Sequence, residues 1–597
     1  MQEYSSPTAF EIPSTAALPD AVTTHAREHP DRVALSRNVD GSWVPVTSRE
    51  FAEQVAALAR GMVAAGVGPG DRVGILGRTS YEWTLADYAV WTAGAVGVPI
   101  YETSSAEQAQ WILSDSGAVA VVVETAAHRA LVESVRADLP DLREVWTIAA
   151  GDLDAVAGRA GEVPEEVLAE RRATLSTDSL ATIIYTSGTT GRPKGCELTH
   201  GNLLYVAELA PRVIPAMVAD GASSLLFLPL AHVFARIIEV GCIQNGARLG
   251  HTADLTSLLA DLGTFRPTFL VAVPRVFEKV YNGARQKAHA GGKGAIFDRA
   301  ERVAVAWSKG QDTGGPSLGV TLQHALFDRL VYGKLRAAMG GQVEYALSGG
   351  APLGERLGHF FRGIGVTILE GYGLTETAGP STVSGPDAMK VGTVGRPAPG
   401  SAVRIDDSGE ILVRGPQVFR GYWHNPGATA ECMHDGWFRT GDIGVLDPEG
   451  YVTITGRIKE LIVTSAGKNV SPAVLEDRIR AHPLVSQCIV VGDNRPFIGA
   501  LITLDAEALP GWLEAKGRPV GTPLAELVDD PEVLAEIQAA VDAANRQVSK
   551  AESIRSFAVL PVEWTVEGGQ LTPSLKLKRS VVMKEFATEV ERIYATS

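Results

Sequence analysis

The stretch YTSGTTGRPKG (residues 185–195) follows an apolar run at residues 180–184. The apolar run predicts a buried strand, and the stretch after it combines glycines, hydroxyl side chains and two cations. Glycines let backbone N–H groups turn toward an anion, Ser and Thr donate hydrogen bonds, and Lys194 adds a positive charge. The stretch therefore predicts a phosphate-binding loop, although a polar turn has the same composition. It is not a Walker loop, because Gly195 follows Lys194 where that motif needs Ser or Thr.

The size and charge of the chain limit the class of protein. A chain of 597 residues exceeds what one hydrophobic core supports, so two or more domains are expected. A net charge of −15 argues against a nucleic-acid-binding protein, which needs a basic face. Four scattered cysteines give neither a disulfide framework nor a metal-binding spacing, and this fits a reducing cytoplasm.

Membrane insertion is not expected from the sequence. The first 20 residues have no basic start and no apolar core, so they do not predict a signal peptide. The most apolar long segment, residues 225–243, is interrupted by Pro229, His232, Arg236 and Glu239, whereas a spanning helix needs about 20 predominantly apolar residues. We expect a cytoplasmic protein and leave open peripheral contact with the inner face of the membrane. The sequence also leaves open whether the protein is a monomer or a homodimer.

Strand and helix patterns alternate along most of the chain, which predicts an α/β fold with parallel sheets. The expected strands are residues 72–76, 98–101, 118–123, 224–228, 269–273, 345–348 and 366–369, and the first expected helices are residues 81–95 and 105–113. From residue 392 short alternating segments separated by Gly and Asp predict a small antiparallel β-barrel. We therefore expect a large N-terminal domain (1–457) of stacked α/β sheets plus this barrel. A smaller, mobile α+β C-terminal domain (458–597) follows, with a helical stretch at residues 531–554.

Two more polar turns follow expected strands. Residues 348–352 read SGGAP, and residues 370–377 read EGYGLTET. Ligands of parallel sheets bind at the carboxyl ends of strands, so these turns and residues 185–195 are expected to meet in one nucleotide site. Tyr372 offers a face for adenine, Thr375 a hydroxyl for a phosphate, and Glu376 a hard oxygen ligand for Mg²⁺.

The motifs YTSGTTGRPKG, SGGAPL, EGYGLTET, GWFRTGDIG, GRIKELI and LTPSLKLKR resemble those of the adenylate-forming acyl-CoA synthetase superfamily, in the same order. The segments PLAHVFAR (229–236), VPRVFEKVY (273–281) and TSAGKNVSP (464–472) look like those of bacterial long-chain fatty-acid–CoA ligases. The resemblance implies a two-step reaction with Mg²⁺ as cofactor and a long-chain fatty acid, ATP and coenzyme A as substrates. A carboxylate first attacks the α-phosphate of ATP to form an acyl-adenylate, and the thiol of coenzyme A then displaces AMP.

The resemblance also implies roles for individual residues. The implied nucleotide-binding residues are Thr186, Ser187, Gly188, Thr189, Thr190, Lys194, Gly350, Ala351, Glu370, Gly371, Tyr372, Gly373, Thr375, Asp442 and Arg457. Asp442 is expected to accept the ribose hydroxyls with support from Arg457, while Thr189 and Glu376 are expected to bind Mg²⁺.

Four further roles come from the resemblance. Lys576 matches the family's late catalytic lysine, although Leu575 stands where the family usually has Gly, and Lys578 and Arg579 are neighbouring cations. Lys459 matches the hinge about which the C-terminal domain rotates between the two steps, and His232 matches a ring beside the acyl site. Ser465, Gly467 and Lys468 are expected to line the coenzyme A tunnel.

Two alternatives remain open at this point. One is a fatty acyl-AMP ligase that passes its product to a carrier protein, and the other is a nucleotide-binding regulator without catalysis. The presence of Glu376, Asp442, Arg457 and Lys576 argues against the regulator. The preferred chain length of the acid cannot be derived from local spacing, because distant segments form an acyl tunnel.

Overall fold

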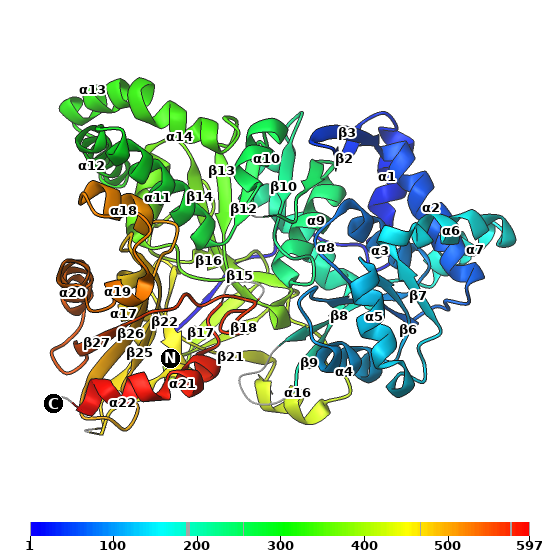
Figure 1. Cartoon of the computed structure of the whole chain (residues 1–597). Helices are drawn as coiled ribbons and strands as arrows, with labels where there is room; N and C mark the ends of the chain where they lie inside the picture. Colours follow the sequence, from blue (N-terminus) through cyan, green and yellow to red (C-terminus); the bar gives the residue numbers. More distant parts are fainter. Residues whose placement is uncertain (1, 187–191, 255, 466, 573–575, 596–597) are drawn as a thin grey trace.

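The structure is a computed structural model that describes residues 2–186, 192–254, 256–465, 467–572 and 576–595 (Figure 1). Within these ranges it contains stacked α/β sheets, an antiparallel sheet and a smaller C-terminal domain, so the predicted α/β fold class is confirmed. No helix in the described ranges combines the length and the apolar character that crossing a bilayer requires.

The first sheet carries the strand that precedes the phosphate-loop motif. Its strand order is β19-β9-β8-β5-β4-β6-β7. The bounds are β4 (Arg72–Leu76), β5 (Val96–Ile100), β6 (Ala118–Val123), β7 (Glu144–Thr147), β8 (Leu180–Thr186), β9 (Lys194–Thr199) and β19 (Gly421–Tyr422). Every residue of β6 is buried, as expected for a parallel strand covered by helices on both faces. β8 and β9 are antiparallel, and the pair Thr186–Lys194 lies at the end of this ladder, where the motif begins and ends.

Helices α3 (Tyr81–Thr92) and α4 (Ala106–Ser116) connect these strands. The hydroxyl of Ser105 accepts the N–H of Gln108 at 3.2 Å, and the side chain of Gln108 accepts the N–H of Ser105 at 3.0 Å. This capping box satisfies two amide groups at the start of α4, so the helix begins where the sequence predicted.

A second group of strands forms the other half of the large domain. Strands β12 (Phe269–Ala272), β13 (Tyr345–Ser348) and β14 (Thr367–Leu374) are parallel, and β15 (Gly379–Val383) returns antiparallel to β14. The sheet β10-β11-β2-β3 comprises β10 (Ser223–Leu226), β11 (Arg248–His251), β2 (Val33–Val39) and β3 (Ser42–Thr47). Helices α9 (Val233–Asn245), α11 (Pro274–Ala290), α12 (Gly294–Gln311), α13 (Leu318–Phe327) and α15 (Glu355–Gly363) accompany these strands, and α12 and α13 form the upper left edge in Figure 1.

The predicted small antiparallel unit after residue 392 is present as a sheet. It contains β17 (Ala402–Ile405), β18 (Glu410–Arg414), β20 (Met433–His434), β21 (Trp437–Leu446) and β22 (Val452–Arg457). Its edge strand is β1 (Gln2–Ser5), which the sequence did not predict. The pairing is reinforced by Arg404, whose guanidinium binds Glu3 at 2.6 Å.

The C-terminal domain has hydrophobic clusters of its own. Its elements include α17 (Pro472–Arg480), β25 (Val485–Val491), β26 (Ile498–Leu504), α18 (Leu509–Ala515), α20 (Pro531–Asn545), β27 (Ile554–Leu560), α21 (Arg579–Glu585) and α22 (Ala587–Ala595). The helix predicted at residues 531–554 was too long. Asn545 ends it, because its side-chain amide bonds both the N–H and the carbonyl of Ile554 at 2.8 and 2.9 Å, which folds the chain back into β27.

Helix α11 of the large domain contacts the C-terminal domain through charged and polar groups. Arg275 binds Asp505 at 2.8 Å, and Lys279 binds Glu507 at 2.9 Å. The side chain of Gln286 donates to the carbonyl of Ala508 at 3.0 Å. We call these three pairs the α11 contact; they stabilise the orientation of the two domains seen here.

Candidate functional site

Tyr372 and Asp442, predicted to bind one nucleotide, are in direct contact. The Tyr372 hydroxyl on β14 donates to Asp442 Oδ2 on β21 at 2.7 Å, and both side chains are buried. Arg457 is the β22 partner of Asp442 and places its Nε 2.8 Å from Oδ1. Burial and the Asp442 carboxylate raise the pKa of Tyr372 well above its usual value, so the hydroxyl keeps its proton. The three side chains form one fixed network between two sheets.

A buried carboxylate that sequence reasoning missed positions Asp442. Glu410 on β18 accepts the backbone N–H of Gly441 at 3.0 Å and the Nε of Arg439 at 2.9 Å. Gly441 adopts a φ of +73°, a conformation that glycine favours, so the turn before Asp442 needs this residue. The spacing between Glu410 and this turn carries no local signal, because the two meet only through strand pairing.

Lys576 of the C-terminal domain lies over the same network. Its Cε is 3.8 Å from the position that a Cβ on Gly350 would take. The side chain remains accessible to solvent, yet the surrounding protein and then Arg457 lower the pKa of its ammonium group, while Asp442 and Glu376 act in the opposite direction. Arg579 binds Glu476 and the carbonyl of Val490 within its own domain. Of these two cations, Lys576 is the one beside the predicted nucleotide residues.

The polar turn at residues 348–352 is held to β14 by Glu370. Its Oε2 accepts the N–H of Leu353 at 3.1 Å, and burial raises the pKa of Glu370 to about 7. Gly350 and Ala351 lie in this turn, and Gly350 has a φ of +83°. Gly371 lies in β14 next to Tyr372. A Cβ on Gly373 would lie 1.8 Å from the carbonyl oxygen of Gly379, so only glycine fits there.

Lys194 and Glu376 meet through a tyrosine that the sequence analysis did not name. The Lys194 ammonium lies 5.1 Å from the centre of the Tyr422 ring, and the Tyr422 hydroxyl donates to Glu376 Oε1 at 2.8 Å. Thr186 faces Lys194 across the β8–β9 ladder, and Thr375 lies directly before Glu376 in the turn η6 (Thr375–Thr377). The other predicted loop residues, Ser187, Gly188, Thr189 and Thr190, lie outside the described residues.

The residues present fit a magnesium ion that arrives with a nucleotide. In the described part of the chain no group of three or more His, Cys, Asp or Glu side chains could hold a metal by itself. Mg²⁺ is usually bound through one or two carboxylates together with substrate phosphates, so the single carboxylate of Glu376 is a suitable donor. The hydroxyl of Tyr422 orients that carboxylate through its hydrogen bond.

His232 directly precedes helix α9 and caps its start. Its Nδ1 accepts the N–H of Phe234 at 3.1 Å, and burial together with the charge of Lys576 lowers the pKa of His232 to about 3. The ring is therefore neutral near pH 7 and close to the ammonium of Lys576. The Phe234 ring is next to the turn at residues 348–352, 3.2 Å from where a Cβ on Gly349 would be.

The predicted hinge and tunnel residues lie apart from this network. Lys459 is exposed in the turn η7 (Ile458–Glu460) that follows β22. Ser465, Gly467 and Lys468 lie between β23 (Ile462–Val463) and β24 (Asn469–Val470). The N–H of Ser465 donates to the carbonyl of Arg495 at 3.0 Å, and Lys468 binds Glu552 at 3.2 Å. In this orientation the loop interacts with its own domain.

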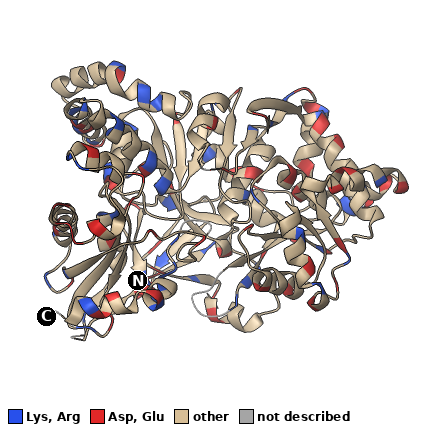
Figure 2. Cartoon of the chain, in the orientation of Figure 1, with Lys and Arg blue, Asp and Glu red and all other residues tan. Residues whose placement is uncertain are grey.

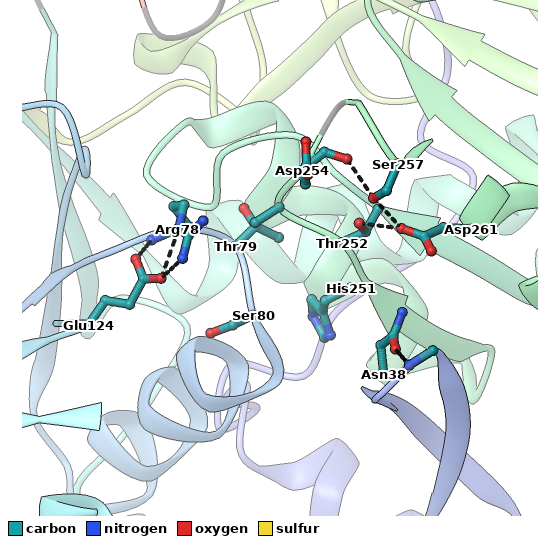
Figure 3. Close-up of a pocket in the computed structure, with 12 residues that line it drawn as sticks. Asn38, Arg78, Thr79, Ser80, Glu124, His251, Thr252, Asp254, Ser257 and Asp261 are labelled. Atoms are coloured by element: carbon teal, nitrogen blue, oxygen red, sulfur yellow. Dashed lines mark hydrogen bonds and ion pairs between the residues drawn. The ribbon is translucent and has the colours of Figure 1, made fainter. Parts of the chain in front are cut away.

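A separate pocket of about 430 Å³ opens where β4, β6 and β11 end (Figure 3). None of its lining residues belongs to the predicted nucleotide site. Arg78 pairs with Glu124 at 2.6 Å, and the hydroxyls of Thr252 and Ser257 donate to Asp261 at 2.7 and 2.8 Å. Because these groups satisfy one another, we assign no ligand to this pocket.

Comparison with known families and proteins gives full-length matches. The AMP-binding enzyme family matches residues 22–423, and the AMP-binding enzyme C-terminal domain matches residues 459–597. The chain is 51% identical to the long-chain-fatty-acid–CoA ligase FadD15 of Mycobacterium tuberculosis, over 100% of both chains. It is 30% identical to the long-chain-fatty-acid–CoA ligase ACSBG2 of Xenopus laevis, over 98% of this chain and 85% of that protein.

Solved structures share the fold at lower identity. The adenylation domain of a carboxylate reductase from Mycobacterium chelonae superposes with a TM-score of 0.74 at 23% identity, covering 97% of this chain and 91% of that one. The O-succinylbenzoate coenzyme A synthetase of Bacillus subtilis, solved with ATP and magnesium ion, gives a TM-score of 0.67 at 21% identity, covering 94% and 98%.

Proposed function

Because the chain belongs to the AMP-binding enzyme family, we propose that it is an ATP-dependent long-chain fatty-acid–CoA ligase that works through an acyl-adenylate. The resemblance deduced from the motifs is confirmed by these matches, and the activity class agrees with the names of the full-length relatives. The observation that carries the proposal is the network of Tyr372, Asp442 and Arg457, together with Lys576 of the C-terminal domain, which lies beside the turn at Gly350.

The first half-reaction joins the acid to AMP. A carboxylate oxygen of the fatty acid bonds to the α-phosphorus of ATP, the bond from that phosphorus to the bridging oxygen breaks, and pyrophosphate leaves. The protein supplies position and charge rather than a covalent bond. Tyr372 is proposed to bind the base, Asp442 the ribose hydroxyls, and Lys576 the charge that develops between the carboxylate and the α-phosphate.

The phosphates are proposed to lie at the other end of the same site. Thr186 and Lys194, together with Ser187, Gly188, Thr189 and Thr190, would bind the β- and γ-phosphates. Glu376 and Thr189 would hold Mg²⁺, which supplies neutralisation of phosphate charge. Tyr422 would position both the Glu376 carboxylate and the Lys194 ammonium.

The second half-reaction needs a different arrangement. The sulfur of coenzyme A bonds to the acyl carbon, the bond from that carbon to the AMP oxygen breaks, and AMP leaves. We propose that the domain of residues 458–597 rotates about Lys459 and brings Ser465, Gly467 and Lys468 to the site. This fits the orientation described above, in which Lys576 lies beside the site while Ser465 and Lys468 bind groups of their own domain. The rotation would separate the pairs of the α11 contact.

The proposal is tested by incubating the protein with ATP, Mg²⁺, palmitate and coenzyme A and identifying the products by mass spectrometry. Palmitoyl-CoA, AMP and pyrophosphate are the expected products. Palmitoyl-AMP without the thioester would indicate an enzyme that loads a carrier protein, and unchanged substrates would indicate a regulator. Competition between fatty acids of increasing length then measures the chain-length preference. The preference for long chains is a proposal that rests on the names of the relatives, and a cytoplasmic location is a proposal that rests on the composition.

A further inference from the structure

Helix α13 lies at the outer edge of the molecule (Figure 1) and carries a row of exposed leucines. The row comprises Leu318 (85% exposed), Leu322 (74%), Leu326 (56%) and Leu330 (50%), the last in the following turn η5 (Asp328–Tyr332). A spacing of four residues places these side chains on one face of the helix. We call them the leucine row.

The opposite face of α13 already anchors the helix. Phe327 is buried, and the ring of His324 stacks on Trp307 of α12 with ring centres 4.5 Å apart. The leucine row is therefore not needed to hold α13 in place. A contiguous exposed apolar surface of this kind is uncommon on a soluble domain and marks an interaction surface.

Positive charge surrounds the leucine row, although the whole chain has a net charge of −15. Residues 293–337 contain seven Lys and Arg against four Asp and Glu, a net charge of +3. Each of the four acids is in an ion pair: Asp298 with Arg285, Glu301 with Arg356, Asp312 with Arg362, and Asp328 with Arg336. Figure 2 shows Lys and Arg positions along these helices at the upper left.

Six cations of this region remain without an acidic partner among the described residues. They are Lys293, Arg299, Arg302, Lys309, Arg329 and Lys334. Arg329 and Lys334 are exposed; Arg329 directly precedes Leu330, the last member of the leucine row, and Lys334 lies four residues after it. Arg299 on α12 donates to Gln323 of α13 at 3.0 Å, which places this cation beside the helix that carries the row.

We propose that the leucine row and these cations dock the protein on an anionic phospholipid bilayer. Exposed leucines can enter the boundary between head groups and acyl chains while the flanking cations contact lipid phosphates. The charge favours this occupant, because the cations have no acidic partners in the part of the chain that the structure describes, and a second copy of the chain would place the same positive region opposite itself. Helix α13 has 10 residues and lies along the surface. The inference rests on this surface alone and not on the proposed ligase activity.

The test is flotation of the full chain with vesicles of phosphatidylcholine, with or without phosphatidylglycerol. The wild type is expected to bind the vesicles that contain phosphatidylglycerol and to release them as salt increases. The double variant Leu322→Gln/Leu326→Gln should bind about 100-fold more weakly, at about tenfold for each leucine. The variant Arg329→Gln/Lys334→Gln should lose the preference for anionic vesicles, at about fivefold for each cation.

Matched controls separate docking from a general effect of substitution. Leu259→Gln/Val445→Gln removes exposed apolar side chains elsewhere, and Lys550→Gln/Arg555→Gln removes exposed cations of the C-terminal domain; both should bind as the wild type does. Thermal unfolding checks that each variant is folded. Binding that the leucine variant leaves unchanged overturns the proposal, as does a wild type that binds neither vesicle. Sedimentation velocity tests the alternative of self-association. If the wild type forms a dimer and binds no vesicles, and the leucine variant is a monomer, the leucine row is a dimer interface.

Discussion

Replacing Asp505 by Asn tests whether the α11 contact stabilises the orientation in which Lys576 reaches the site. Asp505 Oδ2 accepts from Arg275 at 2.8 Å, and its Oδ1 accepts the N–H groups of Glu507 and Ala508 at 3.0 Å each. Asn keeps the Oδ1 acceptor and therefore the local turn. Its amide nitrogen, however, would face a guanidinium that also donates, so the pair with Arg275 is lost.

The size of the effect follows from the burial of the pair. The side chains of Arg275 and Asp505 are 30% and 13% exposed. The strength of this charge-assisted hydrogen bond should therefore lie between that of an exposed ion pair and that of a fully buried one. Its loss should cost about 1–2 kcal/mol in the observed orientation. That free energy corresponds to an increase of about 5–30-fold in the population of other orientations.

The two half-reactions are measured separately. Conversion of supplied palmitoyl-AMP and coenzyme A into palmitoyl-CoA should accelerate by up to about 30-fold, because it needs the domain to leave this orientation. Exchange of pyrophosphate into ATP should fall by less than about twofold while the observed orientation remains the major one. Asp31→Asn, which removes the exposed pair with Arg49, is the control and should change neither rate. Equal changes in both half-reactions, or a slower second one, would refute the reasoning.

Three further predictions concern single residues. Lys576→Ala should slow adenylation by about 10²–10³-fold and spare thioester formation from supplied acyl-AMP, and equal losses would contradict its role. Lys459→Pro, which restricts the backbone at the proposed hinge, should leave pyrophosphate exchange intact and abolish thioester formation; an unaffected second step would argue against rotation there. The Glu370 carboxyl has a pKa of about 7 in the folded protein and a usual value of 4.5, so the folded state binds more protons and the wild type loses stability as pH rises between these values. Glu370→Gln should therefore gain up to about 3 kcal/mol over the wild type between about pH 5 and about pH 8 in urea unfolding, and a constant difference would show that Glu370 titrates normally.

Local sequence signals predicted the elements well where burial and capping decide them. The valine-rich strand at residues 118–123 has the bounds of β6, and the helix start at Ser105 agrees with the capping box of α4. Both features depend on contacts within a few residues. The helix predicted at residues 531–554 failed because Asn545 bonds Ile554, a contact that helical periodicity does not report.

The site was predicted only in part. Spacing alone suggested that turns after strands share one edge, and the resemblance named Tyr372 and Asp442, which are in hydrogen-bond contact. Tyr422 and Glu410 were missed, because each reaches the site through pairing between strands far apart in sequence. Arg275 lies in a motif that the resemblance recognised, yet its partner Asp505 is 230 residues away and belongs to another domain.

The pairing of β1 with β17 has a consequence for synthesis of the protein. Glu3 and Arg404 are 401 residues apart, so the first strand emerges from the ribosome long before its partner has been translated. Until then its backbone N–H and C=O groups are an unpaired edge, available to chaperones or to neighbouring nascent chains. A bulky insertion within β1 should therefore hinder this late pairing, whereas the same insertion in the loop before α20 leaves the pairing free to form.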